Sequence, residues 1–198
     1  MESLALLSFA QSRRLVVALA IAIAFCLVFA WAATAAPPAA VADPSEVLAR
    51  FLGNWKTHTH IRRAAAPPRE FDTFGTATCR QTLGGRYFEF RSESIPPGDA
   101  DLQIMTYDEP NKLYRQWVFS SDGYQHEATG TWDPATATIR WTGKTADSTF
   151  VILDRWLAPD RLEWTLERSG ADGKPLQTIK GTLVREAISP AVISGEDE

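Results

Sequence analysis

Two of the chain's three histidines, His58 and His60, are separated by a single residue in the stretch FLGNWKTHTHIRR. Side chains two positions apart on a β-strand project to the same side, and neutral imidazoles are good ligands for zinc or copper. His126 is the remaining candidate for a third ligand. A metal site is therefore the first chemical hypothesis, and it requires all three histidines to face the same way.

Alternation of apolar and polar residues separates these histidines. On the first predicted strand Trp55 belongs to the interior, so His58 and His60 face solvent among basic neighbours. His126 alternates with Tyr124 and with small apolar residues, which is the pattern of an inward face. We therefore predict no metal site and no cofactor, and we keep His126 as a candidate for ligand contact in the interior.

Other catalytic patterns are missing from the sequence. It contains no G-x-S-x-G elbow, no H-E-x-x-H, no phosphate-binding loop and no dinucleotide fingerprint. His126 and an inward acid such as Asp154 would make an acid–base pair for an isomerase or hydrolase. The strand around Asp154 is apolar on both faces, so alternation does not give its direction. Enzymatic activity stays undecided and is the less favoured hypothesis.

The elements that position these residues are predicted to be strands. Between Trp55 and Glu186 about ten short runs with period two are separated by turn sequences such as LGG, DEPNK and SSDG. Connections this short make neighbouring strands antiparallel, and closure removes exposed edges. The sequence predicts an all-β, antiparallel up-and-down barrel of about ten strands, preceded by a short helix capped near Ser45. A flattened sandwich is the alternative.

The predicted interior is aromatic, with a few polar groups. Arg115 shares a face with Leu113, Trp117 and Phe119, so it is a candidate to pair with a ligand carboxylate; the alternative places it at the rim or beside an acidic residue. The lone cysteine after the leader, Cys79, is predicted to be a small buried residue. The candidate ligand-binding residues are His126, Arg115, Trp132, Trp141, Trp164, Phe88, Phe90 and Tyr124.

The N-terminal residues predict export. Arg13 and Arg14 precede an apolar run over residues 15–33, which is followed by the small residues of an A-x-A cleavage pattern. Residues 1–36 are thus a signal peptide or an uncleaved anchor, 37–44 an Ala/Pro linker, 45–187 the barrel and 188–198 a disordered acidic tail. The barrel is expected in the periplasm or secreted, or held at the inner membrane by residues 15–33.

Charge limits the partners. The formal net charge is −4, and no basic run after the leader is longer than Arg62-Arg63, so we expect no nucleic-acid partner. Membrane contact is expected only through an uncleaved N-terminal segment. A small apolar or amphipathic molecule is the partner that an apolar barrel interior predicts.

Two resemblances support this fold. The Gly53-x-Trp55 start is similar to the lipocalin and calycin pattern, which implies that Trp55 closes one end beneath a basic side chain from the last strand; Arg185 is placed to fill that role. Longer segments, including LGGR at 83–86 and GTWD at 130–133, resemble the bacterial family catalogued as domain of unknown function 1579. That resemblance implies a lipocalin-like barrel, frequently exported, without an established activity or catalytic residues.

Two functions fit such a barrel. The favoured hypothesis is an exported protein that binds a small apolar or amphipathic molecule in its interior. The alternative is an interaction or envelope module whose interior is packed solid by the six tryptophans that follow the leader. An interior cavity of about 300 Å³ or more favours the first, and a filled interior favours the second.

Overall fold

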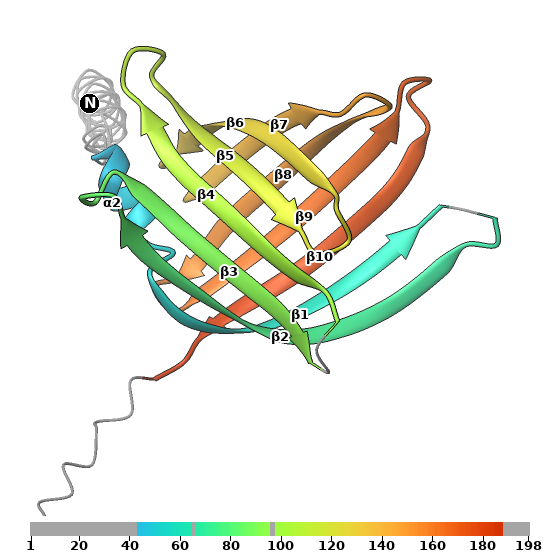
Figure 1. Cartoon of the computed structure of the whole chain (residues 1–198), viewed down its shortest axis with the longest axis horizontal. Coiled ribbons are helices and arrows are strands. Elements are labelled where there is room, and N and C mark those ends of the chain that lie inside the picture. Colours follow the sequence, from blue (N-terminus) through green and yellow to red (C-terminus); the bar gives the residue numbers. More distant parts are fainter. Residues whose placement is uncertain (1–42, 65, 96–97, 188–198) are drawn as a thin grey trace, which may run out of the picture. The chain divides into compact units, whose positions relative to one another are not determined.

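A computed structural model describes residues 43–64, 66–95 and 98–187 of the chain. One short helix, α2 (Pro44–Ala49), precedes ten strands (Figure 1). The strands are β1 (Gly53–Arg63), β2 (Arg69–Thr82), β3 (Tyr87–Ile95), β4 (Ala100–Asp108), β5 (Leu113–Ser120), β6 (Gln125–Asp133), β7 (Thr138–Lys144), β8 (Ser148–Ala158), β9 (Arg161–Gly170) and β10 (Pro175–Arg185).

The strands form one closed antiparallel barrel in which each strand pairs with the next along the chain. The last strand returns to the first, with Trp55 opposite Arg185 and Arg63 opposite Gln177, so the sheet has no free edge (Figure 1). In the turn between β2 and β3, Leu83, Gly84 and Gly85 all have positive φ. The two glycines adopt this conformation without strain. The prediction of an up-and-down barrel of about ten strands is confirmed.

Helix α2 begins two residues earlier than the sequence pattern predicts. Its cap is Asp43, whose carboxylate accepts a hydrogen bond from the backbone nitrogen of Ser45 at 2.8 Å, and Pro44 occupies the first turn. The predicted cap, Ser45, lies inside the helix. The helix buries Val47 and Leu48 in the core, so this short element helps to cover one end of the barrel.

The packed core lies at the α2 end of the barrel. Trp55 is 1% exposed and donates its indole N–H to the carbonyl of Phe51 at 2.7 Å. Phe51 in turn meets Trp156 edge to face, with 4.7 Å between ring centroids. Phe88 and Trp141 belong to the same buried cluster. Large aromatic side chains thus close one end and leave the other half of the interior to smaller or more widely spaced side chains.

Strand glycines make room for these rings. A Cβ at Gly130, opposite Trp141 in the β6–β7 register, would lie 2.6 Å from an indole carbon of that residue. Gly181 is opposite Trp164 in the β9–β10 register and is covered by its indole in the same way. Each indole therefore packs against a glycine of the neighbouring strand.

The predicted leader (1–36), most of the predicted linker (37–44) and the predicted tail (188–198) fall outside the described residues. Within the described ranges, no helix has the length and apolar character needed to cross a membrane.

Candidate functional site

The barrel encloses a cavity of about 750 Å³. Phe51, which follows α2, forms part of its lining at the packed end. At the other end the cavity reaches Ala64, Asp99 and Asp122, which lie in the β1–β2, β3–β4 and β5–β6 connections. We call this second end the mouth.

Apolar side chains form a large part of the wall beside polar ones. Trp164 and Leu166 project inward from β9, while Phe90, Ile152 and Ile179 project from β3, β8 and β10. The period of two places them there, because the alternating positions of β9 are polar or charged. The wall can therefore hold a hydrocarbon or aromatic body.

A pair of amides lies in the lining of β4 and β5. Gln116 is only 3% exposed and donates from Nε2 to Oε1 of Gln103 at 2.8 Å. Among the described residues, Oε1 of Gln116 is buried and has no hydrogen-bond partner. Buried acceptors of this kind are costly unless a donor reaches them.

Asp154 is a buried carboxyl group in the same lining. Its Oδ2 accepts a hydrogen bond from the indole nitrogen of Trp141 at 2.7 Å. Burial raises the pKa of Asp154 to about 7, and the Trp141 bond offsets only part of that rise. The carboxyl group can therefore change its ionisation state near neutral pH.

His126 lies nearer the mouth, between Tyr124 and Phe150, with ring centroids 5.5 and 4.6 Å away. Neither of its ring nitrogens has a hydrogen-bond partner within the described part of the chain. Burial, helped by the positive charge of Arg168, lowers the pKa of His126 to about 4. At neutral pH His126 is therefore an uncharged group that can both donate and accept.

Arg168 is the cation nearest to His126 in this lining, and its guanidinium already contacts other residues. Its Nε donates to Oγ of Ser148 at 2.9 Å, and its guanidinium lies 3.5 Å from Asp147. It also lies over the ring of Tyr124, 5.3 Å from the centroid. These contacts hold Arg168 in place at the mouth.

The eight predicted ligand-binding residues separate into three groups: residues that line the cavity, residues of the packed end, and Arg115, on the outer face of β5. Four of them line the cavity: His126, Tyr124, Phe90 and Trp164. Phe88, Trp132 and Trp141 belong to the packed end and do not line the cavity. No hydrogen bond joins His126 to Asp154 in the described structure, so the acid–base pair of the enzyme hypothesis is not assembled.

Arg115 requires a correction. It lies on the outer face of β5, where it binds Asp108 at 2.7 Å and Glu127 at 2.9 Å. The buried positions of β5 are Tyr114, Gln116 and Val118, which are the opposite face. The candidate role of Arg115 in binding a ligand carboxylate inside the barrel is therefore not supported, and the alternative that placed it beside an acidic residue is the one that the structure shows. Both faces of β5 carry aromatic residues, so alternation alone did not decide between the two placements.

Sequence reasoning missed several polar lining residues. Arg168 continues the inward series of Trp164 and Leu166, so alternation contained the signal. Gln116 lies on the face of β5 that was assigned outward. Asp154 is a candidate acid in the sequence, but its direction stays open there because its strand is apolar on both sides. Only the three-dimensional structure shows that these groups share one cavity.

The predicted structural motif lies at the closed end. The guanidinium of Arg185 lies 4.1 Å from the centroid of the Trp55 ring. Its nitrogens donate to the carbonyls of Leu52, Arg50 (2.9 Å) and Pro159 (3.1 Å). This arrangement fastens the end of β10 to the segment between α2 and β1.

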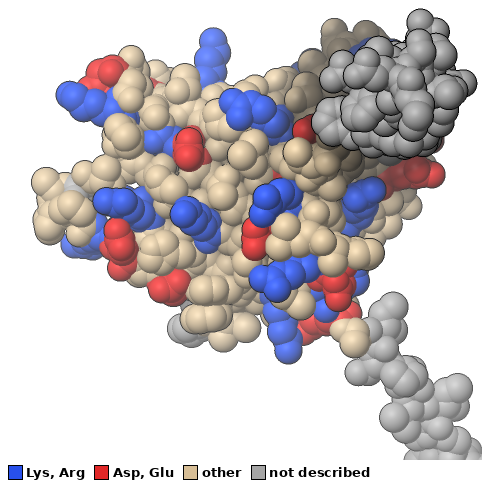
Figure 2. Space-filling view, turned by 180° about the vertical axis from the view of Figure 1, so that it is seen from behind, with Lys and Arg blue, Asp and Glu red and all other residues tan. Residues whose placement is uncertain are grey.

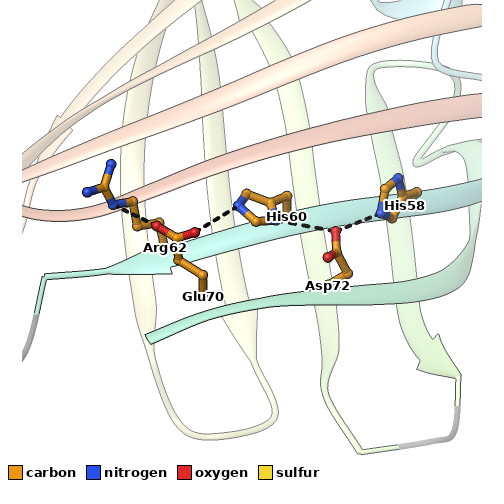
Figure 3. Close-up of polar contacts among 5 residues, drawn as sticks. All are labelled: His58, His60, Arg62, Glu70 and Asp72. Atoms are coloured by element: carbon orange, nitrogen blue, oxygen red, sulfur yellow. Dashed lines mark hydrogen bonds and ion pairs between the residues drawn. The ribbon is translucent and has the colours of Figure 1, made fainter. Parts of the chain in front are cut away.

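The histidine pair lies on the outer face of the β1–β2 hairpin (Figure 3). Nε2 of His58 and Nδ1 of His60 lie 2.9 and 3.3 Å from Oδ1 of Asp72, and Glu70 bridges His60 and Arg62. In the described residues, no group of three or more His, Cys, Asp or Glu side chains is arranged to hold a metal ion. The pair is part of a solvent-exposed row of polar contacts.

Outer charges of both signs are mixed. Figure 2 shows Lys and Arg lying next to Asp and Glu over one face of the protein. Ion pairs such as Arg80–Glu89 at 2.9 Å and Arg155–Glu163 at 3.1 Å join neighbouring strands on the outside. These ion pairs add cross-strand contacts on the outside of the barrel.

A family model described as "Protein of unknown function (DUF1579)" matches residues 42–185. The S-type phycobiliprotein lyase CPES from Guillardia theta matches with a TM-score of 0.52 and 12% identity, over 73% of this chain and 93% of that chain. Rv2717c from M. tuberculosis matches with a TM-score of 0.55 and 12% identity, over 73% and 99%. At these identities the likeness shows a shared fold. A search of curated proteins finds no significant match.

Proposed function

The chain belongs to the DUF1579 family of proteins of unknown function, and we propose that its barrel carries one small apolar or amphipathic molecule outside the cytoplasm. The cavity of about 750 Å³ carries this proposal. Cavities of about 300–1,000 Å³ with apolar walls and a few polar groups are typical of small-molecule sites.

The polar groups of the cavity support binding of a molecule over an empty interior. Oε1 of Gln116 and both ring nitrogens of His126 are buried without a partner in the described residues. Buried polar groups in native proteins nearly always find a partner, so a bound molecule that supplies donors and acceptors would lower the free energy of this state.

The filled-barrel alternative needs side chains where the cavity lies. Of the six tryptophans after the leader, Trp55, Trp132, Trp141 and Trp156 gather in the packed end, and Trp117 belongs to the outward-facing series of β5. Trp164 alone of the six lines the cavity. The distribution of indoles therefore favours the carrier over a solid interaction module.

The proposal also includes export of the protein from the cytoplasm. The charged, apolar and small-residue segments within residues 1–36 support it, because this order is typical of secretory leaders. Fractionation of cells that express the full chain, with mass determination of the purified product, would test it. A product that begins near Pro37 and lies outside the cytoplasm is expected, and a full-length cytoplasmic product would contradict it.

Native mass spectrometry of the exported protein tests the carrier directly. We expect an additional mass of small-molecule size that is present in the native spectrum and lost when the protein is denatured. A spectrum that shows only the protein mass, unchanged after incubation with a lipid extract, would contradict the proposal. A bound metal or an absorbing haem would also contradict it and would return attention to the histidines.

A further inference from the structure

More acidic than basic side chains line the cavity. In the described part of the chain, its guanidinium groups are those of Arg63 and Arg168, and Arg168 already contacts Ser148 and Asp147. The carboxyl groups that line it are those of Glu93, Asp99, Asp101, Asp122 and Asp154. Among the described residues, none of these five forms an ion pair with a lysine or arginine within 4.0 Å.

Three of the carboxyl groups lie together at the mouth. Asp101 is half-buried and accepts a hydrogen bond from the hydroxyl of Ser120. Burial raises the pKa of Asp101, and the negative charges of Asp122 and Asp99 raise it further. An anion that enters past this group would add one more negative charge to a region where charges already repel each other.

The deeper groups favour a hydrogen-bond donor. Gln116 is a lining residue that is only 3% exposed, and its carbonyl oxygen is buried without a partner among the described residues. Asp154 adds carboxyl oxygens to the same lining. A hydroxyl or amino group can donate to these oxygens, whereas an ionised carboxylate has only acceptors to offer.

We infer that the ligand is an uncharged or cationic amphiphile, such as an alcohol or amine with an apolar body, whose donor group enters first. This inference rests on the proposed function and narrows it. We expect free fatty acids to bind less well, because Arg63, the lining guanidinium without an ion pair among the described residues, lies at the end of β1 next to the mouth and contacts the Phe71 ring. The aromatic and aliphatic wall of Phe90, Ile152 and Trp164 receives the apolar body.

A displacement experiment with the full exported protein tests the inference. The probe is diphenylhexatriene, an uncharged hydrocarbon that becomes fluorescent in an apolar cavity. The competitors are decanol, decylamine and decanoate, which share one chain and differ in the head group. At about pH 8 we expect decanol and decylamine to displace the probe at concentrations at least about tenfold below decanoate.

Single-residue variants test which side chains cause the preference for decanol and decylamine over decanoate. Gln116→Met keeps the side-chain volume and is expected to weaken decanol about fivefold while probe affinity stays within about twofold. Asp154→Asn is expected to reduce the advantage of decylamine over decanoate severalfold. Glu167→Gln, on the outer face of β9 next to Arg168, removes one negative charge from the surface and is expected to leave the ratio unchanged.

The outcomes are distinguishable. Failure of diphenylhexatriene to bind would overturn the carrier proposal and this inference together. Probe binding combined with equal or better displacement by decanoate would overturn the inference alone. An equal loss of preference in Glu167→Gln and Asp154→Asn would also overturn it, because the selectivity would then come from the surface field instead of the cavity.

Discussion

The indole nitrogen of Trp141 donates a hydrogen bond to Oδ2 of Asp154 over 2.7 Å, between neighbouring strands β7 and β8. The bond holds the carboxyl group in the cavity lining, and burial still raises its pKa to about 7 from 3.8. Between these two values the folded protein keeps a proton that the unfolded chain has released. Asp154 therefore costs stability progressively as the pH rises through this window.

Asp154→Asn removes that cost. The free energy of unfolding of the variant minus that of the wild type is expected to rise between about pH 4 and pH 8, by about 4 kcal/mol. Urea unfolding across this range measures it. A difference that stays flat or falls with rising pH would contradict the burial of an uncharged carboxyl group.

His126→Gln is expected to show the opposite dependence. The pKa of His126 is lowered to about 4 from 6.5, so the wild type loses stability as the pH falls through this window, because only the unfolded chain takes up the proton. The variant lacks this loss, so its stability relative to the wild type should rise as the pH falls, by roughly 3 kcal/mol. Paired urea titrations at about pH 4.5 and pH 7 measure it. A relative stability that falls with the pH would show that His126 is charged in the fold.

Much of this arrangement follows from alternation where one face of a strand is clearly polar. On β9 the polar positions Glu163, Thr165 and Glu167 oblige Leu162, Trp164 and Leu166 to face inward, as the structure shows. The same logic places His58 and His60 outside. Closure of the barrel follows from short connections and the need to pair the two outer strands.

Alternation fails where both faces are apolar. On β5 the outward residues Trp117 and Phe119 are as apolar as the inward Tyr114 and Val118, so the direction of Arg115 could not be predicted. On β8 the same ambiguity left the direction of Asp154 undecided. The amide pair of Gln103 and Gln116 depends on the register of β4 against β5, which the sequence does not specify.

The Arg185–Trp55 contact predicts a stability effect at the closed end. Arg185→Lys keeps a positive charge but loses the planar fork that serves three carbonyl groups, so it should lower the free energy of unfolding by about 2–3 kcal/mol. Urea unfolding measures it, with the exposed Arg161→Lys as the control. Equal stability of the two variants would contradict a fastening role.

Gly53→Ala should weaken the same contact from the other side. Gly53 has φ of +110°, and a Cβ there would lie 2.7 Å from Nη1 of Arg185. A loss of roughly 1–3 kcal/mol in urea unfolding is expected from strain and from displacement of the guanidinium. An unchanged midpoint would show that the segment can relax without losing the Arg185 contacts.

Arg115→Ala should leave ligand binding intact, because Arg115 lies outside the barrel in contact with Asp108 and Glu127. Diphenylhexatriene affinity is expected to stay within about twofold, and stability to fall little, since exposed ion pairs contribute little to stability. A loss of binding of tenfold or more without unfolding would restore Arg115 as a ligand residue.

Titration of diphenylhexatriene into a matched pair of variants on β10 tests the central claim, that the barrel interior binds a molecule. Ile179 lines the cavity and its neighbour Lys180 is exposed on the outside. Ile179→Trp should place an indole in part of the cavity, where it would obstruct the probe and weaken binding at least about tenfold. Lys180→Trp should retain wild-type affinity with one probe per barrel. Equal binding by both variants, or no binding by the wild type, would contradict the account.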